Sequence, residues 1–324
     1  MTDENCENDN VDFTDEALRE YAKETVKGLF DSASTDEFDE RGLASGNADS
    51  LGTSDAEHHI LSNSIIMKPE NTPMLLASEE TASGTLEVWE ADSVRYLYLQ
   101  DKLAVQSQLD LQQKETLQLS YTRAMMSFLL FQAEPKSALL LGLGGGGIAH
   151  FLSYWFPDLK ITAVDNNESI VSIGEKYFSL STIPQLNIDI TDASAYLRKP
   201  KQKNISVIFV DVHDGRCLPD FLYDAEFMAQ CFQALSLDGV LVINLLINKE
   251  QEFTDILTAL RTSFKGVSFC MTFKDQKNIL LFAFRSPSLL DIDDLKAKAS
   301  QCKKKYHIEF DVFVRGIIQV DEKC

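Results

Sequence analysis

The stretch LLLGLGGGGIAHFL (residues 139–152) carries five glycines in six positions, between an apolar run and a sequence compatible with a helix. Gly142, Gly144 and Gly147 satisfy the pattern G-x-G-x-x-G. Because glycine lacks a Cβ atom, such a bend can turn sharply, approach a ligand closely and let a helix begin beneath it. Taken alone, the pattern is also compatible with a tight strand-to-helix turn that binds nothing.

Apolar strands and helices alternate after this bend. KITAVDN, LNIDITD, ISVIFVDV and GVLVINLL are typical of buried strands, and the segments between them are typical of helices. This alternation predicts an α/β fold with a mostly parallel, Rossmann-like sheet covered on both faces. The last two strands, VSFCMTF and NILLFAF, are separated only by KDQK. That link is too short for a parallel crossover, so we predict a C-terminal hairpin and a seven-stranded sheet with one antiparallel strand.

The chain divides into three predicted regions. TLEVWEA, VRYLYLQ and LAVQSQL alternate apolar and polar residues, and QDK between the last two is a plausible hairpin turn. KETLQLSYTRAMMSFLLF (114–131) has an apolar helical face, and Pro135 ends it. We therefore predict a largely disordered acidic tail over 1–64 with a short helix capped by Thr14, a small antiparallel β domain over 65–112, and a Rossmann-like domain over 113–324.

Composition excludes several classes of protein. The acidic first ten residues do not resemble a secretory signal, and no apolar run reaches the roughly 18 residues of a membrane span. Six widely spaced cysteines without a C-x-x-C pair argue against a zinc site or disulfide framework, so we expect a cytoplasmic protein without a metal. The net charge of −20 disfavours nucleic acid, since RKPKQK and CKKKYH are too short for more than solvated faces.

Acidic residues follow the next two strands of the predicted sheet. Asp165 ends the second strand about twenty residues after the bend, where a carboxylate can accept hydrogen bonds from ribose hydroxyls. Asp192 follows the third strand, where its carboxylate and the backbone of Ala193 can hold an adenine amino group. The carboxyl ends of parallel strands meet at one edge of a sheet. We therefore predict a nucleoside site there, for an S-adenosyl ligand or, as the alternative, for NAD in a dehydrogenase.

From about residue 85 to residue 285 the chain resembles the spermidine synthase-like branch of the class I S-adenosylmethionine-dependent methyltransferases. LGLGGGG, AVDNNESI, ITDASAYL, VDVHD and DGVLVINLL occur in the expected order, and the preceding strands resemble the N-terminal hairpin domain of spermidine synthases. A closing hairpin is typical of class I methyltransferases, whereas an NAD domain continues with parallel units. The resemblance therefore favours an S-adenosyl ligand, either S-adenosylmethionine or its decarboxylated form.

The resemblance also implies roles for individual residues. The donor ligand is expected to contact Gly142, Gly144, Gly145, Gly146, Asp165, Asp192 and Ala193. On the acceptor side, the D-x-x-D after the fourth strand makes Asp211 the expected base and Asp214 the expected anchor, with Tyr121 and His213 near the acceptor. A base is required because an alkylamine with a pKa of about 10 is protonated at neutral pH, and an ammonium has no lone pair for attack. We expect His213 to be a loop residue rather than a metal ligand.

Two departures from the spermidine synthase pattern affect the predicted reaction. Spermidine synthases typically carry an Asp within the glycine motif, where this chain has Gly145, and a Tyr-x-Glu on the preceding helix, where this chain reads Ser120-Tyr121-Thr122. An Asp in the loop would repel the carboxylate of S-adenosylmethionine. A related domain that lacks this Asp occurs in methyltransferases acting on a translation elongation factor.

We therefore predict a transferase that alkylates a small amine or a protein amine, with methyl transfer slightly ahead of aminopropyl transfer to putrescine. A binding protein that has lost its acceptor site is a further alternative. The resemblance also implies a homodimer formed through the N-terminal strands.

Overall fold

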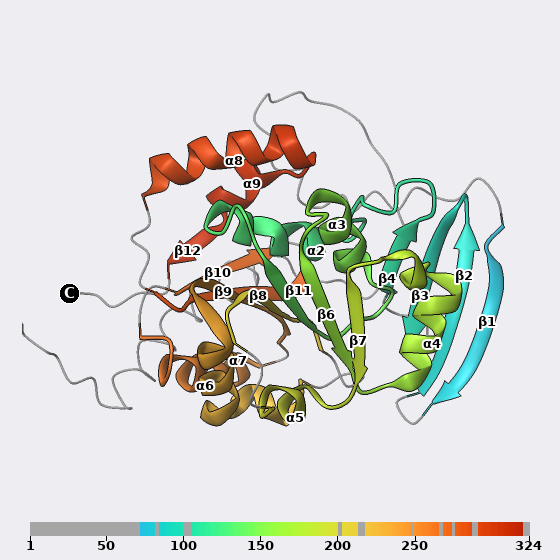
Figure 1. Cartoon of the computed structure of the whole chain (residues 1–324), viewed down its shortest axis with the longest axis horizontal. Helices are drawn as coiled ribbons and strands as arrows, with labels where there is room; N and C mark the ends of the chain where they lie inside the picture. The colour runs from blue at the N-terminus through green and yellow to red at the C-terminus, as the bar shows by residue number, and fades with distance from the viewer. Residues whose placement is uncertain are drawn as a thin grey trace, which may run out of the picture.

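The computed structural model describes residues 72–81, 84–99, 105–199, 203–212, 218–247, 249–265, 268–273, 276–286 and 291–319. The predicted acidic tail over 1–64, with its helix behind Thr14, lies outside these residues. So does the predicted QDK turn. Within the described residues, two sheets of different size lie side by side, joined through a helix between them (Figure 1).

The larger sheet follows from the runs of Val, Ile and Leu that predicted it. Its strand order is β12-β10-β11-β9-β8-β5-β6-β7. The strands are β5 (Ser137–Leu141), β6 (Lys160–Asp165), β7 (Leu186–Ile190), β8 (Ile205–Val210), β9 (Leu235–Leu246), β10 (Ser268–Phe273), β11 (Gln276–Phe284) and β12 (Ile317–Gln319). The five strands from β7 to β9 are parallel, and β11 pairs antiparallel with both β9 and β10.

This order confirms the predicted fold class and the predicted C-terminal hairpin. The prediction of seven strands was one short, because β12 adds to the edge of the sheet antiparallel to β10. That short strand follows two helices, α8 (Ile292–Tyr306) and α9 (Phe310–Arg315), which also went unpredicted.

Helices cover both faces of the larger sheet (Figure 1). Val207 and Phe209 of β8 pack, with even-numbered residues of β9, beneath α2 (Ser120–Met125), α3 (Gly147–Trp155), α8 and α9. The opposite residues of these strands pack beneath α5 (Ala193–Leu197), α6 (Ala225–Ala234) and α7 (Glu250–Arg261). The described connections include the short 3₁₀ turns η2 (Met126–Leu130), η3 (Leu180–Thr182) and η4 (Asp220–Tyr223). The sheet is therefore buried on both sides, as its continuous apolar strands require.

The smaller sheet contains one strand more than the sequence indicated. It is a four-stranded antiparallel meander of β1 (Met74–Thr81), β2 (Gly84–Ala91), β3 (Val94–Leu99) and β4 (Val105–Asp110). The prediction identified the last three strands and missed β1, whose residues are mostly exposed and lack a clear alternation. The sheet packs on α4 (Glu168–Tyr177) through a separate apolar cluster that includes Leu86, Val88 and Phe178.

The helix predicted over 114–131 is much shorter in the structure. It begins at Ser120, becomes a 3₁₀ turn at Met126 and ends at Leu130. The guanidinium of Arg123 donates to the carbonyl oxygens of Leu117 and Gln118, and these hydrogen bonds stabilise the non-helical path of the preceding segment. The apolar residues of that segment are thereby available to line a cavity rather than a helix face.

Candidate active site

The glycine bend binds its own β-strand neighbours through backbone contacts. The backbone N–H of Gly142 donates to the carbonyl of Val164, and that of Asp211 donates to the carbonyl of Leu141. Gly142 has a φ of +94°, and a Cβ atom at this residue would lie 2.1 Å from the backbone oxygen of Asp211. Only glycine fits this position, and its close approach brings the bend against the end of β8.

Gly145, the residue that replaces the expected Asp, is enclosed by side chains. Its N–H donates to Ser107 Oγ over 2.8 Å. A Cβ atom at Gly145 would lie 2.8 Å from Phe178 Cδ1 and 2.9 Å from Ser107 Cβ. Real Cβ atoms essentially never make such contacts, and Phe178 is fully buried. The loop in this conformation therefore has no room for the side chain of an aspartate.

Asp165 lies at the end of β6, directly beside the bend, as its position in the sequence predicted. Oδ2 accepts a hydrogen bond from the N–H of Leu143 over 3.0 Å, and Oδ1 accepts one from Asn167 over 2.9 Å. Burial raises the pKa of this carboxyl group, and the backbone hydrogen bonds partly offset that rise. Asp165 thus connects the glycine bend to the start of α4, whose N-cap is Asn167.

Asp192 and Ala193 lie at the end of the next strand, β7. Asp192 caps α5, because its Oδ1 accepts a hydrogen bond from the N–H of Ala195 over 2.8 Å. Its side chain is exposed, whereas Ala193 is buried. Both residues line the same cavity as Gly142 and Asp165. The structure therefore brings together the residues that were predicted from three successive strand ends.

Asp211 is held from two sides at the end of β8. Tyr121 from α2 donates its hydroxyl to Asp211 Oδ2 over 3.2 Å, and Asn244 from β9 donates its amide to Oδ1 over 2.8 Å. Burial, followed by the charge of Asp211, raises the pKa of Tyr121 well above its ordinary value, so this hydroxyl keeps its proton. Asp211 is half-buried and lines the cavity, so its oriented carboxylate can accept a proton from a bound substrate.

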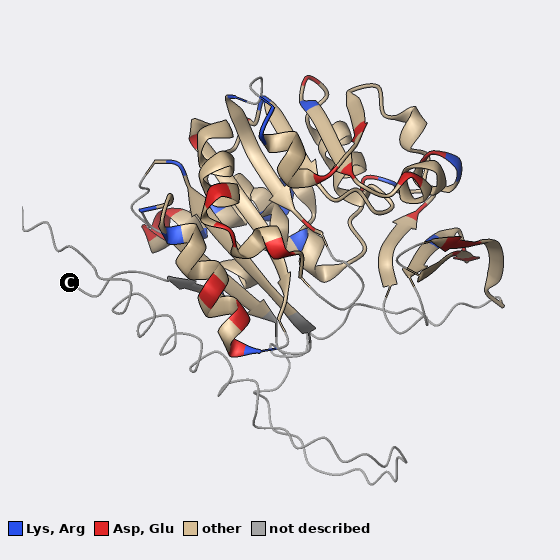
Figure 2. Ribbon diagram, turned by 90° about the horizontal axis from the view of Figure 1, so that it is seen from below, with Lys and Arg blue, Asp and Glu red and all other residues tan. Residues whose placement is uncertain are grey.

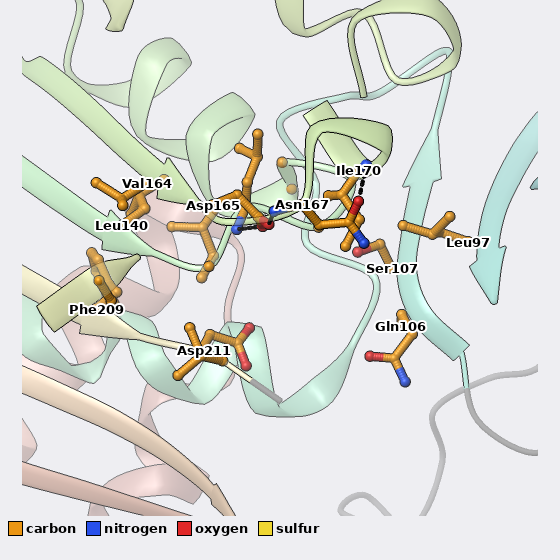
Figure 3. A pocket seen from close by; sticks show the side chains of 18 of the residues that line it. Leu97, Gln106, Ser107, Leu140, Val164, Asp165, Asn167, Ile170, Phe209 and Asp211 are labelled. Atoms are coloured by element: carbon orange, nitrogen blue, oxygen red, sulfur yellow. Dashed lines mark hydrogen bonds between the residues drawn. The ribbon is translucent and has the colours of Figure 1, made fainter. Parts of the chain in front are cut away.

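These residues surround one cavity of about 510 Å³ (Figure 3). Figure 3 shows Asp165 beside the bend, Asp211 at the end of β8, and Gln106 and Ser107 of β4 across the cavity. Among the described residues that line it are four aspartates and no Lys, Arg or His; the aspartates are Asp165, Asp192, Asp211 and Asp220.

Several residues of the site were not predicted from the sequence. Gln106 and Ser107 belong to the small sheet, so only the packing of the two sheets brings them to the cavity. Asn244 did carry a signal, because it is a polar residue within the apolar run GVLVINLL and is buried in the structure. Buried amides are usually hydrogen-bonded, so this residue pointed to a polar partner.

The predicted anchor Asp214 and the predicted acceptor residue His213 lie outside the described residues. Among those that are described, no group of three or more His, Cys, Asp or Glu side chains is arranged to hold a metal ion. Within the described residues, no helix is both long enough and apolar enough to cross a bilayer. Seen from below, basic residues are spread over several elements and interspersed with acidic ones (Figure 2).

Comparison with known proteins shows the family to which this chain belongs. Residues 118–275 match the spermine/spermidine synthase domain. A polyamine aminopropyltransferase of Chromobacterium violaceum is 32% identical over 244 residues, which cover 75% of this chain and 92% of that protein. The chain belongs to the spermine/spermidine synthase family. This confirms the predicted resemblance and the prediction of a transferase that uses an S-adenosyl ligand. A homologue of the eEF1A lysine and N-terminal methyltransferase from Drosophila pseudoobscura pseudoobscura is 27% identical over 140 residues, or 41% of this chain and 21% of that protein.

Solved structures agree with the fold of the family. A probable spermidine synthase from Corynebacterium glutamicum superposes with a TM-score of 0.62 at 19% identity, covering 72% of this chain and 88% of that one. A spermidine synthase in complex with the transition-state analogue AdoDATO gives 0.53 at 17% identity, covering 75% and 83%. Human methyltransferase-like protein 13 in complex with SAH gives 0.53 at 21% identity, covering 58% and 93%. These likenesses confirm the Rossmann-like fold.

Proposed function

We propose that this protein transfers an aminopropyl group from decarboxylated S-adenosylmethionine to a small diamine such as putrescine. The observation that carries the proposal is the charge of the cavity, whose described lining residues include four aspartates and no cationic side chain. Decarboxylated S-adenosylmethionine has an ammonium at the end of its propyl arm and no carboxylate. An acidic lining attracts this arm and the diamine, and it disfavours the carboxylate of S-adenosylmethionine.

The donor is held by the glycine bend and the strand ends in this proposal. Backbone at Gly142 and Gly144 lies against the donor, Asp165 accepts hydrogen bonds from the ribose, and Asp192 with Ala193 holds the adenine. The neighbouring positions Gly145 and Gly146 complete the bend. All of these except Gly145 line the cavity directly, which supports the assignment.

Asp211 prepares the acceptor for attack. Its carboxylate takes a proton from the ammonium of the diamine, and the freed nitrogen lone pair attacks the propyl carbon that is bonded to the sulfonium. A carbon–nitrogen bond forms as the carbon–sulfur bond breaks, and the electron pair of that bond neutralises the sulfur. Tyr121 holds the carboxylate in place through the 3.2 Å hydrogen bond to Oδ2. Catalysis is then chiefly positioning and proton transfer. Asp214 and His213 remain proposed acceptor residues.

The sequence predicted methyl transfer slightly ahead of aminopropyl transfer, because the glycine motif lacks an Asp. The comparisons do not favour methyl transfer over aminopropyl transfer. The relative named as an aminopropyltransferase is more similar and matches over a longer part of the chain than the one named as a methyltransferase. Methyl transfer is still the second candidate because of Gly145. Phe178 and Ser107 leave no room there for an aspartate, which would repel the carboxylate of S-adenosylmethionine.

The test is an incubation with each donor and a diamine, followed by mass spectrometry of the products. We expect spermidine from putrescine and decarboxylated S-adenosylmethionine, and no methylated amine from S-adenosylmethionine. A methylated product without any aminopropyl product would reverse the order of the two candidates. Absence of both products with a panel of diamines would favour the non-catalytic alternative.

A further inference from the structure

A chain of hydrogen-bonded side chains extends from Asp211 into the larger sheet. Asn244 on β9 donates to Asp211 Oδ1 over 2.8 Å, and Asn278 on β11 donates to Asn244 Oδ1 over 2.9 Å. Asn244 is 1% exposed, among apolar neighbours on the same sheet face. Burying an amide in such a place is unfavourable unless its hydrogen bonds are made. Two asparagines in line with the proposed base therefore call for an explanation beyond packing.

Strand register places the three side chains on one face. Val210 of β8 is level with Ile243 of β9, so the next residues, Asp211 and Asn244, lie side by side. Asn278 of β11 pairs with Leu246, two residues beyond Asn244. Because side chains alternate along a strand, Asn244 and Leu246 face the same side, and Asn278 faces it with them. The register of the sheet thus fixes the chain of hydrogen bonds.

The direction of each hydrogen bond follows from the chemistry of the groups. An ionised carboxylate can only accept, so Asn244 must turn its NH₂ group toward Asp211. Its carbonyl oxygen then faces Asn278, which satisfies it with an NH₂ group. The amide of Asn278 in turn prevents Asn244 from rotating its oxygen toward the carboxylate. The pair therefore presents a donor to Asp211 and favours the ionised form of that carboxylate.

We infer that Asn244, oriented by Asn278, is a positioning residue that holds Asp211 ionised, with Oδ2 directed at Tyr121 and the cavity. This inference rests on the proposed function of Asp211 as the base. Asn244 occupies Oδ1, so the orientation of the carboxylate is set from the side of the sheet. Tyr121 holds the other oxygen from α2, on a separate element.

The sharpest test compares two substitutions at Asn278, whose amide donates to Asn244. Asn278→Leu removes a donor and leaves Asn244 unoriented. Asn278→Asp supplies an acceptor that draws the NH₂ of Asn244 away and turns its oxygen toward Asp211. We expect kcat to fall about threefold in Asn278→Leu, and about tenfold or more in Asn278→Asp and Asn244→Leu. The KM for the donor should stay within about twofold, and the acid limb of the kcat profile should move to higher pH.

Controls separate positioning from general damage to the fold. Ser268→Ala removes another buried polar group from β10 of the same sheet and should keep wild-type kcat. Melting temperature and calorimetric affinity for S-adenosylhomocysteine identify variants that have lost the fold. If well-folded Asn278→Asp and Asn244→Leu proteins keep the wild-type kcat and pH profile, the inference is wrong.

Nuclear magnetic resonance of the Asn244 side-chain amide tests the same arrangement without turnover. Its protons should be shifted downfield by the carboxylate, and Asp211→Asn should abolish that shift. An unshifted amide in the parent protein would overturn the proposed orientation. A parent protein that makes no aminopropyl product would instead overturn the proposed function and the catalytic role of the pair, while the spectra still decide whether Asn244 is oriented.

Discussion

The two ends of the cavity are built in different ways. The donor end combines the backbone of the glycine bend with the carboxylates of Asp165 and Asp192, which lie at strand ends next to recognisable motifs. The acceptor end consists of side chains from α2, β8 and β9, with Tyr121 separated from Asp211 by 90 residues and Asp211 from Asn244 by 33. The glycine bend and the strand ends therefore determine the class of ligand, and the side chains of the acceptor end determine which reaction takes place.

The largest expected effect breaks the acceptor end alone. Asp211→Asn removes the proton acceptor but leaves the glycine bend unchanged. We expect kcat to fall about 10²- to 10⁴-fold, because this is the usual contribution of a general base. Affinity for S-adenosylhomocysteine, measured by calorimetry, should change less than twofold. A comparable loss of affinity would mean that the two ends are not separate.

A single glycine links the two ends. A Cβ atom in Gly142→Ala would meet the backbone oxygen of Asp211 at 2.1 Å, and alanine is strained at a φ of +94°. We expect a loss of at least about 3 kcal/mol in the free energy of unfolding, together with weaker donor binding.

Chemical denaturation of the Gly142→Ala and Gly147→Ala variants measures this loss in the free energy of unfolding. The nearest atom to a Cβ at Gly147 is Leu117 Cδ2 at 3.9 Å, so this control should keep wild-type stability. Equal stabilities for the two variants would show that the bend is less confined than described.

A smaller effect tests the contribution of the small sheet to the donor end. Ser107→Ala removes the acceptor for the N–H of Gly145 and should weaken donor affinity about three- to tenfold, as expected for one hydrogen bond. Ser153→Ala is the matched control, because Ser153 Oγ donates to Gln185 over 2.8 Å and does not line the cavity. Calorimetry should detect a change only in the first variant.

The smallest expected effect concerns the pH dependence of donor binding. Burial raises the pKa of Asp165, so protonation begins at a higher pH than for an ordinary Asp. The ionised form is the better acceptor for ribose hydroxyls, and donor affinity should therefore weaken as pH falls through this raised pKa.

The contribution of Asp165 to the stability of the ligand-free protein depends on pH in the opposite direction to donor binding. The pKa of Asp165 is higher in the folded protein than in the unfolded chain. This difference therefore stabilises the fold at pH values below the pKa of the unfolded chain, and the stabilisation is lost as pH rises through the pKa of the folded protein. Calorimetric titrations of S-adenosylhomocysteine from neutral to acid pH should show the weaker binding, and Asp165→Asn should remove this pH dependence. Identical pH profiles for parent and variant would exclude Asp165 from the donor site.

The sequence predicted the donor end better than the acceptor end for a physical reason. Parallel strands bring their carboxyl ends to one edge, so Gly142, Asp165 and Asp192 could be placed together from their order alone. At the acceptor end, Asn244 meets Asp211 only through the register of the sheet, which no local pattern encodes. The helix over 114–131 was overestimated because Arg123, which donates to the carbonyl oxygens of Leu117 and Gln118, is held by an ion pair of 2.8 Å with Glu309, 186 residues away in the sequence.

A crystal structure with the transition-state analogue AdoDATO tests the central claim most directly. The account predicts that its adenosine lies between the glycine bend, Asp165 and Asp192, and that the amine of its acceptor arm lies within hydrogen-bond distance of Asp211. An adenosine bound elsewhere, or an acceptor arm directed away from Asp211, would contradict it.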